Sequence, residues 1–94
     1  MEITICGLSY TVEFVDQVLP GDPNTIGLIT PQDQKIRISN GISPENKAQT
    51  LLHETIHGTL IGLGMLELSE NENLVQGLAQ SLHQILKLDL TSFS

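Results

Sequence analysis

The chain has 94 residues, which suffice for one small domain over residues 1–94 and leave no room for a second core. Its formal net charge is −7 with only four Lys and Arg residues, which excludes the basic surface that a nucleic-acid partner requires. The single cysteine indicates a reducing compartment, and no signal peptide or transmembrane segment is visible, so we expect a cytoplasmic protein with no membrane partner.

The first 42 residues have the alternating pattern of half-buried strands. Polar and apolar residues alternate over residues 2–6 and 10–16, which predicts a first hairpin. A strand-like segment at residues 26–30 precedes a clean alternation at 35–39, which predicts a second hairpin. We therefore expect residues 1–42 to form a small, mostly antiparallel sheet of about four strands.

Five residues of this sheet region have individual predicted places. Tyr10 and the Cys6 thiol are expected in the core. Gly27 interrupts a strand, which indicates a bulge or a close approach by another backbone. Lys35 and Arg37 alternate with apolar residues, so both cations should point outward and protect a free sheet edge against aggregation.

From residue 43 onward the apolar spacing becomes helical. Ser43 followed by Pro44 is typical of a helix start, which predicts an active-site helix over residues 43–64. A second helix is predicted over residues 69–88, and the tail at 89–94 should be frayed. Its predicted buried stripe consists of Leu74, Val75, Leu78, Ala79, Leu82, Ile85 and Leu86. The expected architecture is therefore α+β, with the sheet packed on two long helices.

The first helix contains the pattern His-Glu-x-x-His. His53 and His57 are four residues apart, so both imidazoles lie on one face within reach of a single ion. Zn²⁺ suits two imidazoles and a carboxylate, and a catalytic zinc keeps its fourth position for water. Glu54 lies about 100° around the helix from His53, where it flanks the metal and can activate a zinc-bound water. The alternative is a chance motif, but an unpaired His57 among apolar neighbours would be costly to bury.

The third ligand must come from the second helix or from the connection before it. Glu72 begins the apolar stripe and is the preferred ligand, whereas Glu70 lies about 200° away on the helical wheel. Glu67 is a weaker candidate in the connection. Glu72 has a rival role in a capping box with Ser69. His83 lies about 16 Å further along the helix and is expected to pack or face solvent.

These residues resemble the gluzincin metallopeptidases, and among them the small ImmA/IrrE-like proteins of phages and other mobile elements. The similar stretches are residues 36–39, 49–57 and 74–82, which cover the hairpin, the active-site helix and the helix after it. The resemblance implies a minimal zincin fold, with His53, His57 and Glu72 as zinc ligands and Glu54 as general base. In related proteins the peptidase can cleave a repressor that governs an element's genes.

The expected function is zinc-dependent endopeptidase activity on a peptide or protein substrate, with a repressor as one such substrate. The substrate would add as a strand to an open sheet edge beside the active-site helix, and residues 26–39 supply that edge. The cleft is small, so specificity can require a partner or a homodimer. Two other readings stay open: a zinc-binding regulatory module without catalysis, and a small acidic adaptor without metal.

Overall fold

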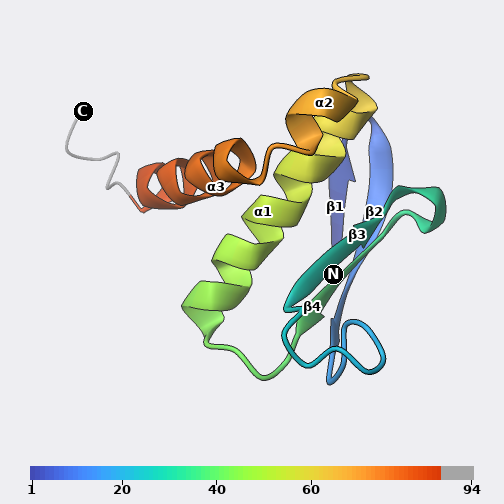
Figure 1. The fold of residues 1–94 in the computed structure, drawn as a ribbon, viewed down its shortest axis with the longest axis vertical. Coiled ribbons are helices and arrows are strands. Elements are labelled where there is room, and N and C mark those ends of the chain that lie inside the picture. The colour runs from blue at the N-terminus through green and yellow to red at the C-terminus, as the bar shows by residue number, and fades with distance from the viewer. Residues whose placement is uncertain (88–94) are drawn as a thin grey trace.

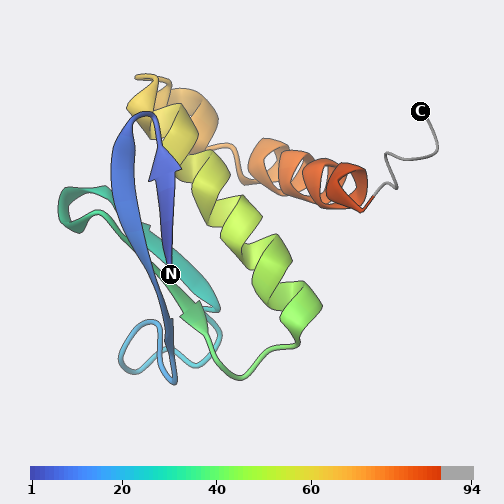
Figure 2. The ribbon, with the colours of Figure 1, turned by 180° about the vertical axis from the view of Figure 1, so that it is seen from behind.

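The computed structural model describes residues 1–87, and the predicted frayed tail lies outside this range. The fold is α+β, as expected, with a four-stranded sheet followed by three α-helices (Figure 1). The strands are β1 (Glu2–Ile5), β2 (Leu8–Val15), β3 (Gly27–Thr30) and β4 (Lys35–Ser39), and the helices are α1 (Pro44–Gly62), α2 (Leu66–Ser69) and α3 (Glu72–Leu86). Helix α1 lies against the sheet, and α3 packs on the side of α1 that faces away from it (Figures 1 and 2).

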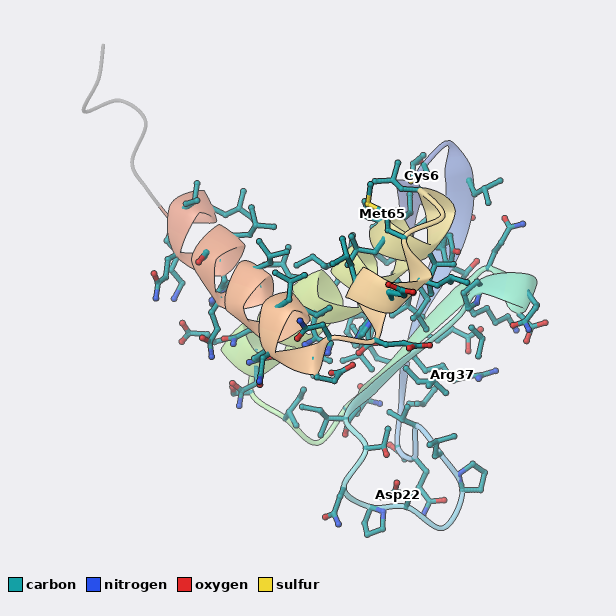
Figure 3. The ribbon with its side chains drawn as sticks, turned by 45° about the horizontal axis from the view of Figure 1, so that its top comes forward. Cys6, Asp22, Arg37 and Met65 are labelled. Atoms are coloured by element: carbon teal, nitrogen blue, oxygen red, sulfur yellow. The ribbon has the colours of Figure 1, made fainter. Side chains whose placement is uncertain are left out.

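Strands β1 and β2 form the first predicted hairpin, with a tighter turn than expected. Ile5 pairs with Leu8, so the loop contains only Cys6 and Gly7, whose φ angles are 50° and 82°. Two positive φ angles match the type I′ turn that suits the twist of a hairpin. The prediction of a core thiol is wrong, because this turn removes Cys6 from the strand and leaves it exposed (Figure 3). Its Sγ lies 3.7 Å from the carbonyl oxygen of Thr59.

The sheet has the order β1-β2-β4-β3 and is mixed rather than mostly antiparallel. The two hairpin pairings are antiparallel, but β2 and β4 pair in parallel at the centre. Ile36 and Ile38 of β4 have no exposed surface, and burying them favours a central place for this strand. The shorter strand β3 therefore occupies the edge.

Lys35 and Arg37 do not guard the sheet edge, because they lie on the interior strand β4. Both point toward Glu13 of β2, with N–O distances of 3.6 and 3.8 Å. Figure 3 shows Arg37 extending away from the helices. The outward direction was predicted correctly, but the edge itself belongs to β3.

The main core lies between the sheet and α1. Its buried members are Ile5, Tyr10, Val12, Ile36 and Ile38. Tyr10 is thus a core residue, as expected. Helix α1 begins as predicted, with Ser43 as N-cap and Pro44 at the first position, and the Ser43 hydroxyl accepts a hydrogen bond from the Asn46 N–H at 3.1 Å.

The predicted second helix is divided in two. Short helix α2 ends at Ser69, and Asn71 caps α3 by accepting a hydrogen bond from the Leu74 N–H at 3.1 Å. A strong N-cap so close to Ser69 starts a new helix and changes the chain direction. Helix α3 runs antiparallel to α1, because Lys87 at its end forms an ion pair with Glu45 at the start of α1.

The apolar stripe of α3 is only partly buried. Val75 and Ala79 have no exposed surface and pack with Ile56 of α1 in a second small cluster. Further along the stripe, Leu78 and Leu82 are about two-fifths exposed. Among the described helices, none combines the length and apolar character that a membrane span requires.

Gly27 is a place where the edge strand lies close against α1, as its position in the strand predicted. A Cβ atom at residue 27 would lie 2.4 Å from the Cγ2 of Thr50 and 3.2 Å from the Oε2 of Glu54. Thr50 is β-branched and stiff within a helix, so it has little freedom to yield. The absence of a side chain at residue 27 therefore allows β3 to lie against α1.

We expect Gly27→Ala to lower the free energy of unfolding by about 1–3 kcal/mol through overpacking. Urea denaturation measures the effect. Gly77→Ala is the matched control, because a Cβ there meets nothing within 4 Å, and it should stabilise α3 by roughly 1 kcal/mol. Thr50→Ser removes the clashing methyl group and should restore part of the loss. Equal stability of Gly27→Ala and wild type would contradict the close packing.

Candidate metal centre

His53, His57 and Glu72 converge at one point between α1 and α3. The Nε2 atoms of the two histidines are 3.2 Å apart. One Glu72 oxygen lies 3.2 Å from His53 Nε2 and the other lies 2.9 Å from His57 Nε2. The three residues each offer one ligand atom, all within 4.8 Å of one another, so they could hold a metal ion.

The antiparallel arrangement of the helices produces this convergence. His53 and His57 occupy successive turns of α1, on the face that meets α3. Glu72 is the first residue of α3, and the break after α2 places it opposite His57. The histidines are mostly covered, with 19% and 14% of their side-chain surface exposed, whereas Glu72 is 66% exposed. The site is therefore open to solvent on the Glu72 side.

Two neighbouring side chains fix the orientation of the imidazoles. His53 Nδ1 lies 2.8 Å from Gln76 Oε1, and His57 Nδ1 lies 3.0 Å from Ser69 Oγ. The Gln76 carbonyl oxygen only accepts, so His53 Nδ1 must carry the proton and Nε2 keeps its lone pair. The Ser69 hydroxyl can accept as well as donate, so its contact with His57 Nδ1 is compatible with the same tautomer. In this tautomer both Nε2 lone pairs point to the place where Glu72 lies.

Gln76 and Ser69 were not predicted from the sequence. The signal for Gln76 is its spacing, because it lies four residues after Glu72 and so on the same face of α3. The sequence pattern around Ser69 indicates a capping box with Glu72, which the structure contradicts. Ser69 is buried at the end of α2 and contacts His57, whereas Asn71 caps α3.

Glu54 lies next to the three converging residues but outside their group. Its side chain is almost fully buried, and Gly27 of the edge strand lies against it. Burial raises the pKa of the Glu54 carboxyl group above its ordinary value. The electrostatic interaction with His53 lowers this pKa, Glu72 raises it, and a hydrogen bond from the Ile29 backbone lowers it. The carboxyl group therefore holds a proton more readily than an exposed glutamate does.

The other candidate residues lie outside this centre. Among residues 1–87, the group of His53, His57 and Glu72 includes neither Glu70 nor Glu67. Glu70 follows α2 and is exposed, and Glu67 lies within α2 and is also exposed. His83 lies in the last turn of α3, outside the donor group.

Two cavities adjoin the centre, and Gly27 lines both of them. The first has a volume of about 400 Å³ and lies between the start of β3, the first half of α1 and Gln76. The second has a volume of about 340 Å³ and includes His57, Ile61 and Glu72. Both reach His53 and Glu54. A chain segment lying along β3 would therefore pass directly over the centre.

No protein-family model, curated protein or solved structure matches the chain, so the argument for a metal rests on the site itself. Two imidazoles with aligned lone pairs and one carboxylate form a donor set that suits Zn²⁺ and leaves a fourth position open. Hydrogen bonds to both Nδ1 atoms are also typical of histidines that bind metals. The residues present thus fit a zinc ion.

Gln76→Leu should weaken metal affinity by about 10–100-fold, because His53 loses the acceptor that fixes its tautomer. Competition with a chromophoric chelator measures the affinity. Gln76→Glu keeps an acceptor at the same place and should retain tight binding. Gln80→Leu makes the same change at an exposed position of α3 and should have no effect. Equal loss in Gln76→Leu and Gln80→Leu would show that Gln76 does not orient His53.

Proposed function

We propose that the protein is a cytoplasmic zinc-dependent endopeptidase. The observation that carries this proposal is the buried Glu54 carboxyl group beside the three converging donors, outside their group. A structural metal site does not require such a group, and burying a carboxylate without a cationic partner lowers stability. A hydrolase needs a group that accepts and then donates a proton.

His53, His57 and Glu72 would hold the zinc ion, which when bound supplies Lewis-acid activation of water and of the substrate carbonyl group. Glu54 would take the proton from the attacking water and later give it to the leaving amine nitrogen. Its raised pKa favours this role, since the carboxyl group must hold the proton between the two transfers. Gln76 and Ser69 keep the imidazoles in the ligating tautomer.

The free edge of β3 supports an extended peptide as the substrate. The Ser39 N–H donates to the Ile26 carbonyl at 2.9 Å, which makes these two residues a hydrogen-bonded pair of the β3–β4 ladder. Hydrogen-bonded and non-hydrogen-bonded pairs alternate, so the backbone groups of Gly27 and Ile29 point away from β4. The Ile29 backbone hydrogen-bonds to Glu54, and the other outward-pointing backbone groups can add a substrate strand beside the metal centre.

The proposed substrate is a regulatory protein of a phage or another mobile element. Support comes from the order of elements, in which a hairpin, a His-Glu-x-x-His helix and a helix beginning with Glu72 follow one another as in ImmA/IrrE-like peptidases. A repressor is the corresponding candidate. Its flexible linker would present the extended segment that the edge strand accepts.

A second candidate function is a zinc-binding regulatory module without catalysis. The exposure of Glu72 favours it, because a third ligand that is 66% exposed sits at an open and shallow site. Both functions require the metal, but only the peptidase requires Glu54 to transfer a proton. A fixed, non-catalytic site would tolerate any residue of similar size at residue 54.

The test begins with metal analysis of protein purified without a His tag. One zinc per chain in wild type, and its loss in His53→Ala, supports the metal centre. Zinc-loaded protein is then incubated with a diverse peptide library, and the products are identified by mass spectrometry. Cleavage supports the peptidase, whereas bound zinc without any cleavage supports the regulatory module. No zinc after exposure to the metal contradicts both.

A further inference from the structure

The larger cavity beside the metal centre has the chemistry of a side-chain binding pocket. Its volume of about 400 Å³ falls within the range of small-ligand pockets. Apart from His53 and Glu54, its lining side chains carry no ionisable group. The lining consists of Thr25, Ile26, Gly27, Asn46, Gln49, Thr50, His53, Glu54 and Gln76. A side chain next to the cleaved bond would enter this space from a strand on β3.

The hydrogen bonds already made in the lining determine what it offers a ligand. The Thr25 hydroxyl donates to the Asp22 carboxylate at 2.7 Å, so the Thr25 oxygen remains as an acceptor. Gln76 Oε1 accepts from His53, so the Gln76 NH₂ group remains as a donor. Thr25, just before β3, thus offers the cavity a fixed acceptor, and Gln76 of α3 offers it a fixed donor. The side-chain amide of Gln49 on α1 also lines the cavity.

The cavity is unsuited to an acidic side chain. Glu54 lines it, and the Asp22 carboxylate accepts the hydrogen bond of the lining residue Thr25. All four Lys and Arg residues of the chain lie within the described range and are placed elsewhere. Lys35 and Arg37 face Glu13, Lys87 pairs with Glu45, and Lys47 lies over the Phe14 ring. A carboxylate in this cavity would therefore meet the Glu54 carboxylate, with Asp22 bonded to the lining residue Thr25, and no Lys or Arg.

We propose that this cavity selects substrates with a carboxamide side chain, glutamine or asparagine, beside the cleaved bond. A carboxamide presents both an NH₂ donor for Thr25 and a carbonyl acceptor for Gln76. The isosteric glutamate loses the donor and adds a charge. A lysine side chain would compete for Glu54, which must stay free to accept the proton of water. The inference rests on the proposed peptidase function and names its substrate class.

The test compares peptides that differ only in having Gln, Glu or Lys at one position, with that position scanned on both sides of the cleaved bond. At one position, kcat/KM should be roughly tenfold or more higher for Gln than for Glu and Lys. Gln49→Lys adds a cation to the lining and should lower the Gln/Glu ratio at that position by about tenfold. Gln80→Lys adds the same charge outside both cavities and should leave the ratio unchanged.

Each outcome separates the pocket from the peptidase. Cleavage without discrimination between Gln and Glu, a preference for Lys, or equal ratios in Gln49→Lys and wild type would overturn the pocket and leave the peptidase standing. If no peptide is cleaved, the peptidase fails, and the same peptides are titrated into ¹⁵N-labelled zinc-loaded protein. Amide shifts at Thr25, Gly27 and Gln49 with the Gln peptide alone would support the pocket. No shift, or equal shifts with the Glu peptide, would overturn it.

Discussion

The Glu54→Gln protein is expected to keep its zinc and to lose peptide hydrolysis. Glutamine has the size of glutamate but cannot take a proton from water, so the rate should fall by about 10²–10⁴-fold. Zinc should stay bound, because the donor group consists of His53, His57 and Glu72. Hydrolysis of a fluorogenic peptide and metal content, measured on the same preparation, test both halves of this expectation.

Glu70→Gln is the matched control for this substitution. It removes one carboxylate from an exposed residue two positions before Glu72, outside the donor group. Its activity should equal that of wild type. Activity retained in Glu54→Gln would eliminate Glu54 as the proton carrier. Loss of zinc in Glu54→Gln would instead make Glu54 a ligand, and the roles of Glu54 and Glu72 would have to be exchanged.

Glu54→Gln, which should abolish activity, is expected to stabilise the metal-free protein at neutral pH. The pKa of Glu54 is raised by burial in the folded state, so its contribution to stability is present at low pH and is lost as pH rises through this raised value. Glu54→Gln removes a buried negative charge and should raise the free energy of unfolding at neutral pH by roughly 0.5–2 kcal/mol. Below the ordinary value of 4.5 the two proteins should be equally stable. A neutral-pH gain in stability with loss of activity indicates that the carboxylate is kept for chemistry.

The elements of the fold were predictable from the sequence because their signals are local. The alternation in the two hairpins, the Ser43-Pro44 helix start and the spacing of His53 and His57 each involve a few neighbouring residues. Sheet order was not predictable, because the place of β4 beside β2 depends on contacts between distant segments. Cys6 illustrates the limit at the scale of one residue, since a turn that starts one position earlier removes it from the core.

In the metal centre, too, the features that depend on local sequence were predictable and those that depend on tertiary contacts were not. The histidine pair follows from helix geometry alone, and Glu72 follows from an assumed antiparallel pairing of helices. The hydrogen bonds from His53 to Gln76 and from His57 to Ser69 depend on how α2 and α3 meet α1. The break between α2 and α3, which stands where the rival capping box of Ser69 and Glu72 would have formed, also places Glu72. The orientation of the site is therefore a tertiary property, although the His-Glu-x-x-His part of its chemistry lies within one helix.

His57→Ala should abolish the dependence of stability on zinc. An ion that binds only the folded state adds about 2.7 kcal/mol at a free concentration 100 times its Kd, which corresponds to a Tm increase of about 10–20 °C for a domain of this size. The effect should be large here, because α3 is held to α1 by a small apolar cluster and by the donors that the ion would join. Thermal unfolding with excess zinc and with EDTA measures the increase.

His83→Ala is the control for this last experiment, because it removes a histidine of α3 that lies outside the donor group. It should keep the full zinc-dependent increase in Tm, whereas His57→Ala should show none. An equal increase in both variants would place zinc elsewhere on the chain. No increase in wild type would mean that the two imidazoles and Glu72 do not bind zinc. The buried Glu54 carboxyl group would then have no catalytic role to account for it.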